Sequence, residues 1–375
     1  MTRQRKDLQK RSENAPGQKS KVTKQSSRKK VQALTRLQCE KNQLVLEGVT
    51  EPRIPAKTSK KEVNIDIDEH DNPTLTLRGS LVHPSPLPHI GWVFSEDVWV
   101  KMLNKEHNYR HSKNFMHLHP RIQPRMRSIL LDWLMEVSEA YTLHRQTFYL
   151  AQDYFDRFML TQNNTEKNVL QLIGITCLFV ASKMEEACPP KVSEMAYVTA
   201  GTYYEHEILQ MELIILKALS WNLCPETAIS WLKLYFQISS SANSDLLEPQ
   251  FPQDMFVQMT RLLDLCILNI NSLDFQYRVL AASVLCYFLQ QETVEKVSGL
   301  SKDIIQPCVT WMAPFAESVD MFGLVTMRSF VQINKDDRYN IQTHTDYMTM
   351  LEHVEQKLNS QFPTSPNSTE KTCSH

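Results

Sequence analysis

The chain has 375 residues, enough for two or three domains of ordinary size, and its 41 Lys and Arg residues nearly balance its 42 Asp and Glu residues. Only 8 residues are glycine and none are spaced as G-x-G, which excludes a Rossmann phosphate turn and a P-loop. The apolar content of 42% and the 16 Met residues favour a helical protein with a sizeable core.

The first ninety residues form a predicted polar tail. Residues 1–30 hold eleven Lys or Arg residues against two acidic residues, a net charge of +9. A basic arm without apolar periodicity is typical of a disordered segment, either a simple solvated tail or a signal for nuclear import. No apolar stretch follows the charges, so a signal peptide is not predicted. We expect residues 1–90 to be disordered.

Ordered structure is predicted from about Trp92. Ser95 is the predicted N-cap of a helix over 96–108, which has an apolar side, and residues 91–123 form this helix and a linker. Four histidines crowd the end of this stretch without a Cys or carboxylate at ligand spacing, so no metal site is predicted. They are His107, His111, His117 and His119.

From Pro124 onward, apolar periodicity predicts two sets of five helices. The first set, within residues 124–222, covers 124–141, 146–160, 166–186, 192–199 and 205–219. The second set, within residues 223–320, covers 226–238, 253–270, 275–291, 294–297 and 302–318. The two third helices are similar in composition, which indicates a duplicated five-helix unit. Residues 321–375 follow as a C-terminal extension with a regulatory tail.

The third helix of the first unit carries no charge between Asn168 and Ser182. It is shorter than the roughly 20 residues that a bilayer requires. It is therefore predicted to be surrounded by other helices, with Gly174 allowing one of them to approach closely. The eight cysteines are scattered without a C-x-x-C motif and are typical of a reducing compartment.

The first helix of that unit has an apolar arc wider than one core-facing stripe needs. Met126, Leu130 and Trp133 share one edge of it, which fits either a deeply buried helix or an edge exposed to a partner. Arg127 lies inside the arc and must be paired, because an unpaired buried charge is very costly. Asp156 on the next helix is its predicted partner, in a structural rather than a catalytic pair.

Two further ions border apolar surfaces. Lys183 ends the uncharged third helix and Glu212 interrupts an apolar stripe of the fifth. They form either an intramolecular salt bridge or hydrogen-bonding groups at the edge of a docking surface. No hydrolase, zinc-protease or kinase motif is present, so no catalytic activity is predicted.

At these residues the sequence resembles the cyclins, and the E-type cyclins in particular. Residues 126–130 read Met-Arg-Ser-Ile-Leu, close to the family's MRAIL signature with Ser128 in place of alanine. The resemblance continues through LHRQTFYLAQ at 143–152 and ASKMEE at 181–186. The E-type features are SPLP at 85–88, LLDLC at 262–266, WMAPF at 311–315 and NIQTHT at 340–345.

The resemblance implies an all-α fold of two stacked five-helix cyclin boxes, preceded by an N-terminal helix. It implies a non-catalytic regulatory subunit, without cofactor, that activates a cyclin-dependent kinase, most simply cyclin-dependent kinase 2, at the G1/S transition. Lys183 and Glu212 would contact the kinase C helix. The apolar surface receiving that helix would be lined by Val180, Met184, Leu216, Trp221 and Leu223.

The same resemblance implies a docking patch for R-x-L motifs of substrates and inhibitors. Met126, Leu130 and Trp133 would form its apolar part. Glu136 would pair with the arginine of the motif, and Gln171 would hydrogen-bond its backbone.

The sequence departs from the family at three places. The tail has Thr364-Ser-Pro in place of the Thr-Pro-Pro of the family degron. Ser365 and Thr369 still resemble a doubly phosphorylated degron read by a ubiquitin ligase, the alternative being an ordinary Ser-Pro. Residues 230–238 resemble a centrosome-targeting segment, with Lys233 as a departure. Cys188 stands where an aromatic residue commonly precedes the two prolines.

Two other classes of protein share paired cyclin-like boxes. A transcription factor of this type would need a zinc ribbon and basic surfaces, which the sequence lacks. A pocket-type scaffold should lack the combination of Lys183 and Glu212. We therefore expect a nuclear protein, with cytoplasm and centrosome as further locations, and neither membrane nor direct nucleic-acid contacts.

Overall fold

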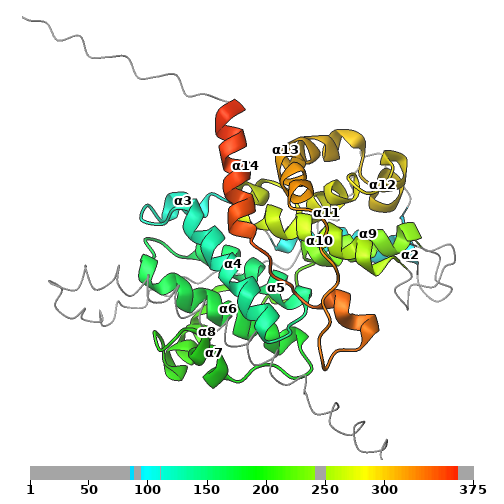
Figure 1. Cartoon of the computed structure of the whole chain (residues 1–375). Coiled ribbons are helices and arrows are strands. Elements are labelled where there is room, and N and C mark those ends of the chain that lie inside the picture. Colours follow the sequence, from blue (N-terminus) through cyan, green and yellow to red (C-terminus); the bar gives the residue numbers. More distant parts are fainter. Residues whose placement is uncertain (1–84, 88–93, 110, 241–250, 362–375) are drawn as a thin grey trace, which may run out of the picture. The chain divides into compact units, whose positions relative to one another are not determined.

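The computed structural model describes residues 85–87, 94–109, 111–240 and 251–361, with side chains as far as Leu358. Within these ranges the chain folds as helices joined by short turns, and extended backbone pairs at one isolated bridge, between His144 and Ile341 (Figure 1). The predicted all-α class is confirmed. None of the described helices is long and apolar enough to span a bilayer. The disorder predicted for the two ends concerns residues that lie almost wholly outside the described ones.

The first half has the five predicted helices. They are α4 (Pro124–Ala140), α5 (Arg145–Thr161), α6 (Leu170–Glu185), α7 (Val192–Val198) and α8 (Glu205–Ala218). Proline at the first position of α4 is favourable, because the missing N–H has no partner there in any helix. A 3-10 turn, Lys167–Val169, precedes α6, and α6 ends before Pro189 as predicted.

Helix α6 lies at the centre of this half. It contacts α4, α5, α7 and α8, and every side chain from Leu172 to Ser182 is buried. A Cβ on Gly174 would lie 2.8 Å from Leu130 Cδ1, so glycine is what allows α4 to pack this closely on α6. The predicted central helix and the predicted close approach are both confirmed.

The second half also has five helices. They are α9 (Ala228–Ser240), α10 (Gln253–Leu268), α11 (Tyr277–Leu285), α12 (Gln291–Ser298) and α13 (Lys302–Met321), with a 3-10 turn, Ile270–Asp274, after α10. The prediction of one helix over 275–291 was wrong. After Leu285 the amide N–H groups of Tyr287 and Phe288 bond to carbonyls three residues back, which ends α11 in tight turns. Helix α12 then ends at Gly299, whose φ of +64° suits glycine.

The N-terminal helix α2 (Ser95–Asn108) packs on the second half. Its Trp99 is buried and meets Trp231 of α9 edge-on, with ring centroids 5.6 Å apart. The prediction that Ser95 caps this helix was wrong. Phe94 occupies the cap position without a side-chain bond, and Ser95 is the first helical residue, whose carbonyl accepts the hydroxyl of Ser85 at 3.2 Å. A one-turn helix α3 (Phe115–Leu118) follows.

The C-terminal extension contains helical structure that the sequence did not predict. A 3-10 turn, Lys335–Asn340, leads to α14 (Tyr347–Gln361), which contacts α13, α10 and α4. The last part of the described chain therefore packs against helices of both halves.

Asp264 of α10 is the point where these parts meet. Its carboxylate is fully buried and accepts hydrogen bonds from the phenol of Tyr149 at 2.8 Å and the guanidinium of Arg145 at 3.3 Å, both on α5. The C-terminal extension supplies two more donors, the amide of Gln342 at 3.0 Å and the phenol of Tyr347 at 3.1 Å. Burial raises the pKa of Asp264. One carboxylate thus joins the first half, the second half and the extension.

Candidate functional site

The predicted ions Lys183 and Glu212 form an ion pair with each other. Lys183 lies at the C-terminal end of α6, and Glu212 lies in the middle of α8. The lysine side chain is 38% exposed and the glutamate 11%, and the ammonium also sits 4.3 Å from the centroid of the Phe179 ring. The intramolecular salt bridge, one of the two alternatives from the sequence, is therefore present. Its position at the surface leaves it able to face a partner as well.

Exposed apolar side chains surround α8, and we call them the α8 surface. They are Met184 at the end of α6, Leu209, Leu213 and Ile214 on α8, and Trp221 just after it, which is 65% exposed. Met184 directly follows Lys183 in the chain, and Leu213 directly follows Glu212. Exposed apolar side chains beside charged ones are typical of a protein-binding surface.

The residues predicted to line this surface differ in their exposure. Met184 and Trp221 are exposed as expected, but Val180, Leu216 and Leu223 are buried in the core. Sequence reasoning missed Leu209 and Leu213, which lie one helical turn apart. The helical periodicity could have indicated them. Ile208 and Ile215 mark the core-facing side of α8, and Leu209 and Leu213 lie away from that side.

The predicted docking patch on α4 is also only partly exposed. Met126 and Trp133 are half-buried, whereas Leu130 is 6% exposed and packs at Gly174. Ile129, which was not predicted to take part, is 45% exposed. Most of the wide apolar arc is therefore buried in the core. Its accessible side chains are Met126, Ile129 and Trp133.

Gln171 at the start of α6 and Glu136 on α4 are both half-buried. Glu136 belongs to a row of carboxylates on successive turns of α4, with Asp132 and Glu139, which we call the α4 acidic row. His344 of the C-terminal extension meets this row, with its Nε2 at 2.8 Å from Asp132 and its Nδ1 at 3.8 Å from Glu136. The sequence pattern gave no indication of this histidine's position.

Arg127 and Asp156 form the predicted pair, which is fully buried. The guanidinium donates two parallel hydrogen bonds of 2.7 Å to the carboxylate. It also donates to the carbonyl of Ile267 at 2.8 Å, and the neighbouring hydroxyl of Ser128 donates to the carbonyl of Leu268 at 2.8 Å. Because both carbonyls lie at the end of α10, this ion pair fastens α4 to the second half. Its role is structural, as predicted.

Two of the four clustered histidines, His111 and His119, are engaged at separate places. His119 is buried between the carbonyl of Met159 and the amide of Thr165, while His111 stacks on Tyr277 with centroids 4.3 Å apart. Nowhere in the described ranges do three or more potential ligands gather in a manner that could hold a metal ion. The thiols of Cys177 and Cys266 are buried in the core, and burial raises the pKa of both.

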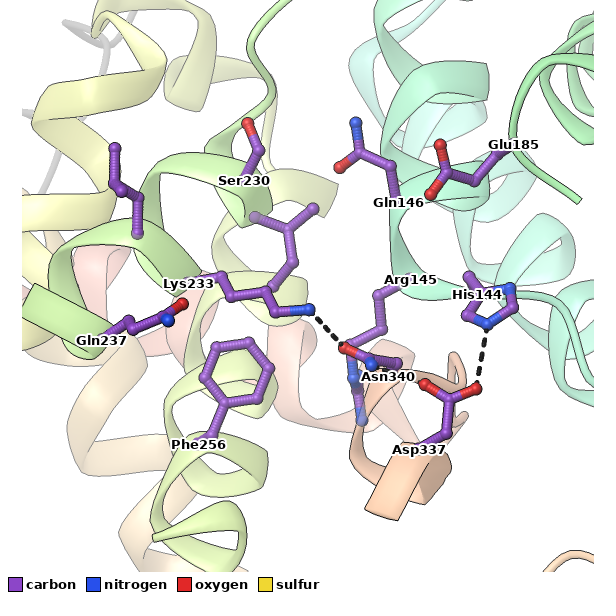
Figure 2. A pocket seen from close by; sticks show the side chains of 12 residues that line it. His144, Arg145, Gln146, Glu185, Ser230, Lys233, Gln237, Phe256, Asp337 and Asn340 are labelled. Carbon is purple, nitrogen blue, oxygen red and sulfur yellow. Dashed lines mark hydrogen bonds and ion pairs between the residues drawn. The ribbon is translucent and has the colours of Figure 1, made fainter. Parts of the chain in front are cut away.

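A pocket of about 410 Å³ opens between the N-terminal end of α5, the helix α9 and the C-terminal extension (Figure 2). Lys233 donates to Asn340 at 3.1 Å and lies 5.4 Å from the centroid of Tyr339, and burial lowers its pKa. His144 contacts Asp337 at 3.3 Å, and its hydrogen bond to Glu186 raises the pKa of His144 to about 9. Charges of both signs line the pocket, and the carboxylates of Asp337 and Glu185 partly offset the effect of burial on Lys233.

Comparison with known proteins gives a consistent result. The profile of the cyclin N-terminal domain matches residues 97–224, and that of the cyclin C-terminal domain matches residues 227–354. The chain is 48% identical over 313 residues to the G1/S-specific cyclin-E1 of Gallus gallus, which covers 79% of this chain and 77% of that protein.

Further relatives agree. The G1/S-specific cyclin-E1 of Rattus norvegicus is 49% identical over 274 residues, with coverage of 73% of this chain and 67% of that protein. The G1/S-specific cyclin-E of Drosophila melanogaster is 40% identical over 309 residues, with coverage of 72% and 43%. With two cyclin domains, ten helices in two sets of five and these relatives, the chain belongs to the cyclin family and, within it, to the G1/S-specific E-type cyclins.

Proposed function

We propose that this chain activates cyclin-dependent kinase 2 at the G1/S transition and recruits substrates that carry an R-x-L motif. As a cyclin, it is a regulatory subunit of a cyclin-dependent kinase and contributes no catalytic group of its own. The observation that carries the kinase-binding proposal is the α8 surface with the Lys183–Glu212 pair at its border. Apolar area with hydrogen-bonding groups at its rim is the composition of a specific protein interface.

The proposed mechanism is a shift between two states of the kinase. Its C helix must move inward to complete the internal Lys–Glu ion pair and the metal site that orient ATP. The α8 surface offers exposed leucine, isoleucine and tryptophan side chains to that helix. A cyclin that binds the inward state more tightly than the outward one shifts the equilibrium by its difference in affinity. The buried helix α6 packs against α8 and supports this surface from the core side.

The kinase proposal is tested by adding the full chain to purified cyclin-dependent kinase 2 and following phosphorylation of a short peptide that lacks an R-x-L sequence. The rate should rise to a plateau as the chain saturates the kinase. The same titration with other cyclin-dependent kinases tests the choice of partner. Stimulation of another kinase but not of cyclin-dependent kinase 2 would leave the cyclin assignment intact and overturn the proposed partner.

The docking proposal rests on the accessible part of the patch on α4. Met126, Ile129 and Trp133 provide apolar contact for the leucine of the motif, Glu136 a charge for its arginine and Gln171 a hydrogen bond for its backbone. A charged group beside an apolar pocket suits a short motif that combines an arginine with a leucine.

Replacing Met126 and Trp133 together by alanine is expected to weaken phosphorylation of R-x-L substrates. The cost should be about 2 kcal/mol or more, because partly buried aromatic anchors dominate interfaces of this kind. Leu130 is left unchanged, since it is buried and its truncation would damage the core. Phosphorylation of a short peptide without the motif is the control, and an equal loss for both substrates would show that the patch is only core.

Two proposals concern residues outside the described ones, and a third concerns α9. The basic residues 1–30, which lie outside the described ones, are proposed to direct the protein to the nucleus. The segment over 230–238 within α9 is proposed to direct it to the centrosome. Ser365 and Thr369 are proposed as phosphorylation sites read by a ubiquitin ligase, whose arginine clusters recognise phosphate groups.

A further inference from the structure

Leu130 and Gly174 meet where α4 packs against α6 (Figure 1). A Cβ built on Gly174 would lie 2.8 Å from Cδ1 of Leu130, 3.1 Å from its Cδ2 and 3.1 Å from its Cγ. Beyond the chain neighbours and the helix backbone of Gly174, these are the three nearest atoms, and all of them belong to Leu130. Leu130 therefore occupies the space that a side chain at position 174 would need.

Leu130 also lies beneath the apolar part of the docking patch. On α4 it follows Met126 by four residues and precedes Trp133 by three, so the three side chains share one face of the helix. Met126 and Trp133 are half-buried, whereas Leu130 keeps only 6% of its surface exposed. Leu130 is thus the lower side chain between two higher ones, and its small exposed edge belongs to the patch.

The side of α6 that faces Leu130 also carries Gln171. Gln171 precedes Gly174 by three residues, so the two lie one turn apart on the same face of the helix. Because Gly174 meets Leu130, this face is turned toward α4. Gln171 is the residue assigned above to the backbone of an R-x-L motif, so the present inference rests on that proposed function.

We propose that Gly174 is a specificity-determining residue of the docking site. It sets how low Leu130 lies, and thereby how much room the patch leaves for the apolar side chain of a motif. A methyl group at position 174 would displace the flexible end of Leu130. Because the surrounding core is close-packed, the displaced atoms move toward the exposed edge and take up this room. Shortening Leu130 to valine has the opposite effect and leaves more room.

The experiment uses three peptides that differ only at the leucine position of the R-x-L motif, which is alanine, leucine or phenylalanine. Their Kd values are measured for the full chain. The ratios of these values isolate the contribution of that one side chain. The parent should bind the leucine peptide at least about tenfold more tightly than the alanine peptide, because burial of the longer side chain removes more apolar surface from water.

Two single variants should change this preference in opposite directions. Gly174→Ala should weaken binding of the leucine peptide about fivefold or more and leave the alanine peptide within about twofold of the parent, because the added methyl group overfills the site. Leu130→Val should improve binding of the phenylalanine peptide relative to the leucine peptide by about threefold, because the larger ring fills the space that the missing methylene leaves.

The double variant tests whether Gly174 acts through Leu130. Gly174→Ala combined with Leu130→Val adds one carbon atom and removes one, which is a volume-conserving exchange. It should restore the parent's preference for the leucine peptide to within about twofold. A residue that only supports the fold would not give this recovery of peptide preference.

Leu178→Val is the matched control. Leu178 lies one turn beyond Gly174 on α6 and is fully buried, so the substitution removes the same methylene as Leu130→Val from the same core. Both variants should lower the Tm by about 2–4 °C. Only Leu130→Val should change the ratios between the peptides. Thermal unfolding of each variant checks that it is folded.

The outcomes separate this inference from the function on which it rests. If the parent binds none of the peptides, the docking function itself is wrong, and the role of Gly174 falls with it. If the parent prefers leucine and both single variants keep its ratios, docking stands and Gly174 does not determine specificity. A preference lost in Gly174→Ala but not restored in the double variant would also overturn the inference. Should Gly174→Ala fail to fold, the phenylalanine-to-leucine ratio of Leu130→Val decides.

Discussion

Replacing Arg127 by alanine is expected to lower the free energy of unfolding by about 3–5 kcal/mol, the usual cost of removing one partner of a buried ion pair. The substitution leaves the carboxylate of Asp156 buried, with the amide of Gln152 as a remaining donor. It also removes the donor to the carbonyl of Ile267, so α4 and α10 lose a direct connection. Urea unfolding followed by circular dichroism measures the change.

Two comparisons define this effect. Arg121→Ala removes an exposed surface pair with Glu166 and should leave the free energy of unfolding nearly unchanged. Replacing Arg127 and Asp156 together by apolar residues of similar volume should destabilise less than Arg127→Ala alone, because no charge is then left without its partner. A loss below about 1 kcal/mol for Arg127→Ala would mean that the pair is not essential to the packing of the two halves.

Replacing Lys183 and Glu212 together by alanine is expected to reduce affinity for the kinase by about 30-fold, or about 2 kcal/mol, and to reduce activation accordingly. The double change removes a surface ion pair without leaving either charge unpaired, so the fold should be retained. Binding is measured by titration with the kinase, and thermal unfolding checks the fold.

The matched control is another lysine–glutamate pair at the surface, far along the chain from α8. Lys357 on α14 contacts Glu317 on α13 at 2.9 Å, with side chains 36% and 64% exposed. The double alanine variant of that pair should bind the kinase like the parent. If the folded Lys183/Glu212 variant binds the kinase with unchanged affinity, the pair is only a salt bridge within the cyclin.

The spacing of apolar residues and the prolines at helix ends predicted most of the helices, because both of these signals are local in the sequence. Pro124 begins α4, the two prolines at 189 and 190 follow α6, and the charge-free stretch of α6 is buried on every side. Arg127 was predictable for a similar reason, since an arginine inside an apolar arc requires a partner and the next helix offers the carboxylate of Asp156.

The exposure of individual side chains was less predictable, because it depends on which helices cover which face. Leu130 lies on the same stripe as Met126 and Trp133, yet it is buried, since the missing side chain at Gly174 brings α6 against it. Val180, Leu216 and Leu223 are apolar like Trp221, but they are buried in the core whereas Trp221 is exposed.

No local feature of the sequence predicts where His344 lies in the fold. It lies more than 200 residues along the chain from the Asp132 that it contacts, and only the return of the C-terminal extension brings the two together. The length of α14 was likewise not visible from its composition, because its stability depends on packing against α4, α10 and α13.

The junction at Asp264 bears on how the protein is made. During synthesis this carboxylate leaves the ribosome long before Gln342 and Tyr347, so an earlier nascent chain lacks two of the four donors seen in the finished fold. Burying the carboxylate at that stage would leave part of its hydrogen-bonding capacity unsatisfied, which is costly for a buried charge. The last step of vectorial folding is therefore expected to be the closure of the C-terminal extension over α10, which makes both boxes one cooperative unit and leaves neither as a separable module.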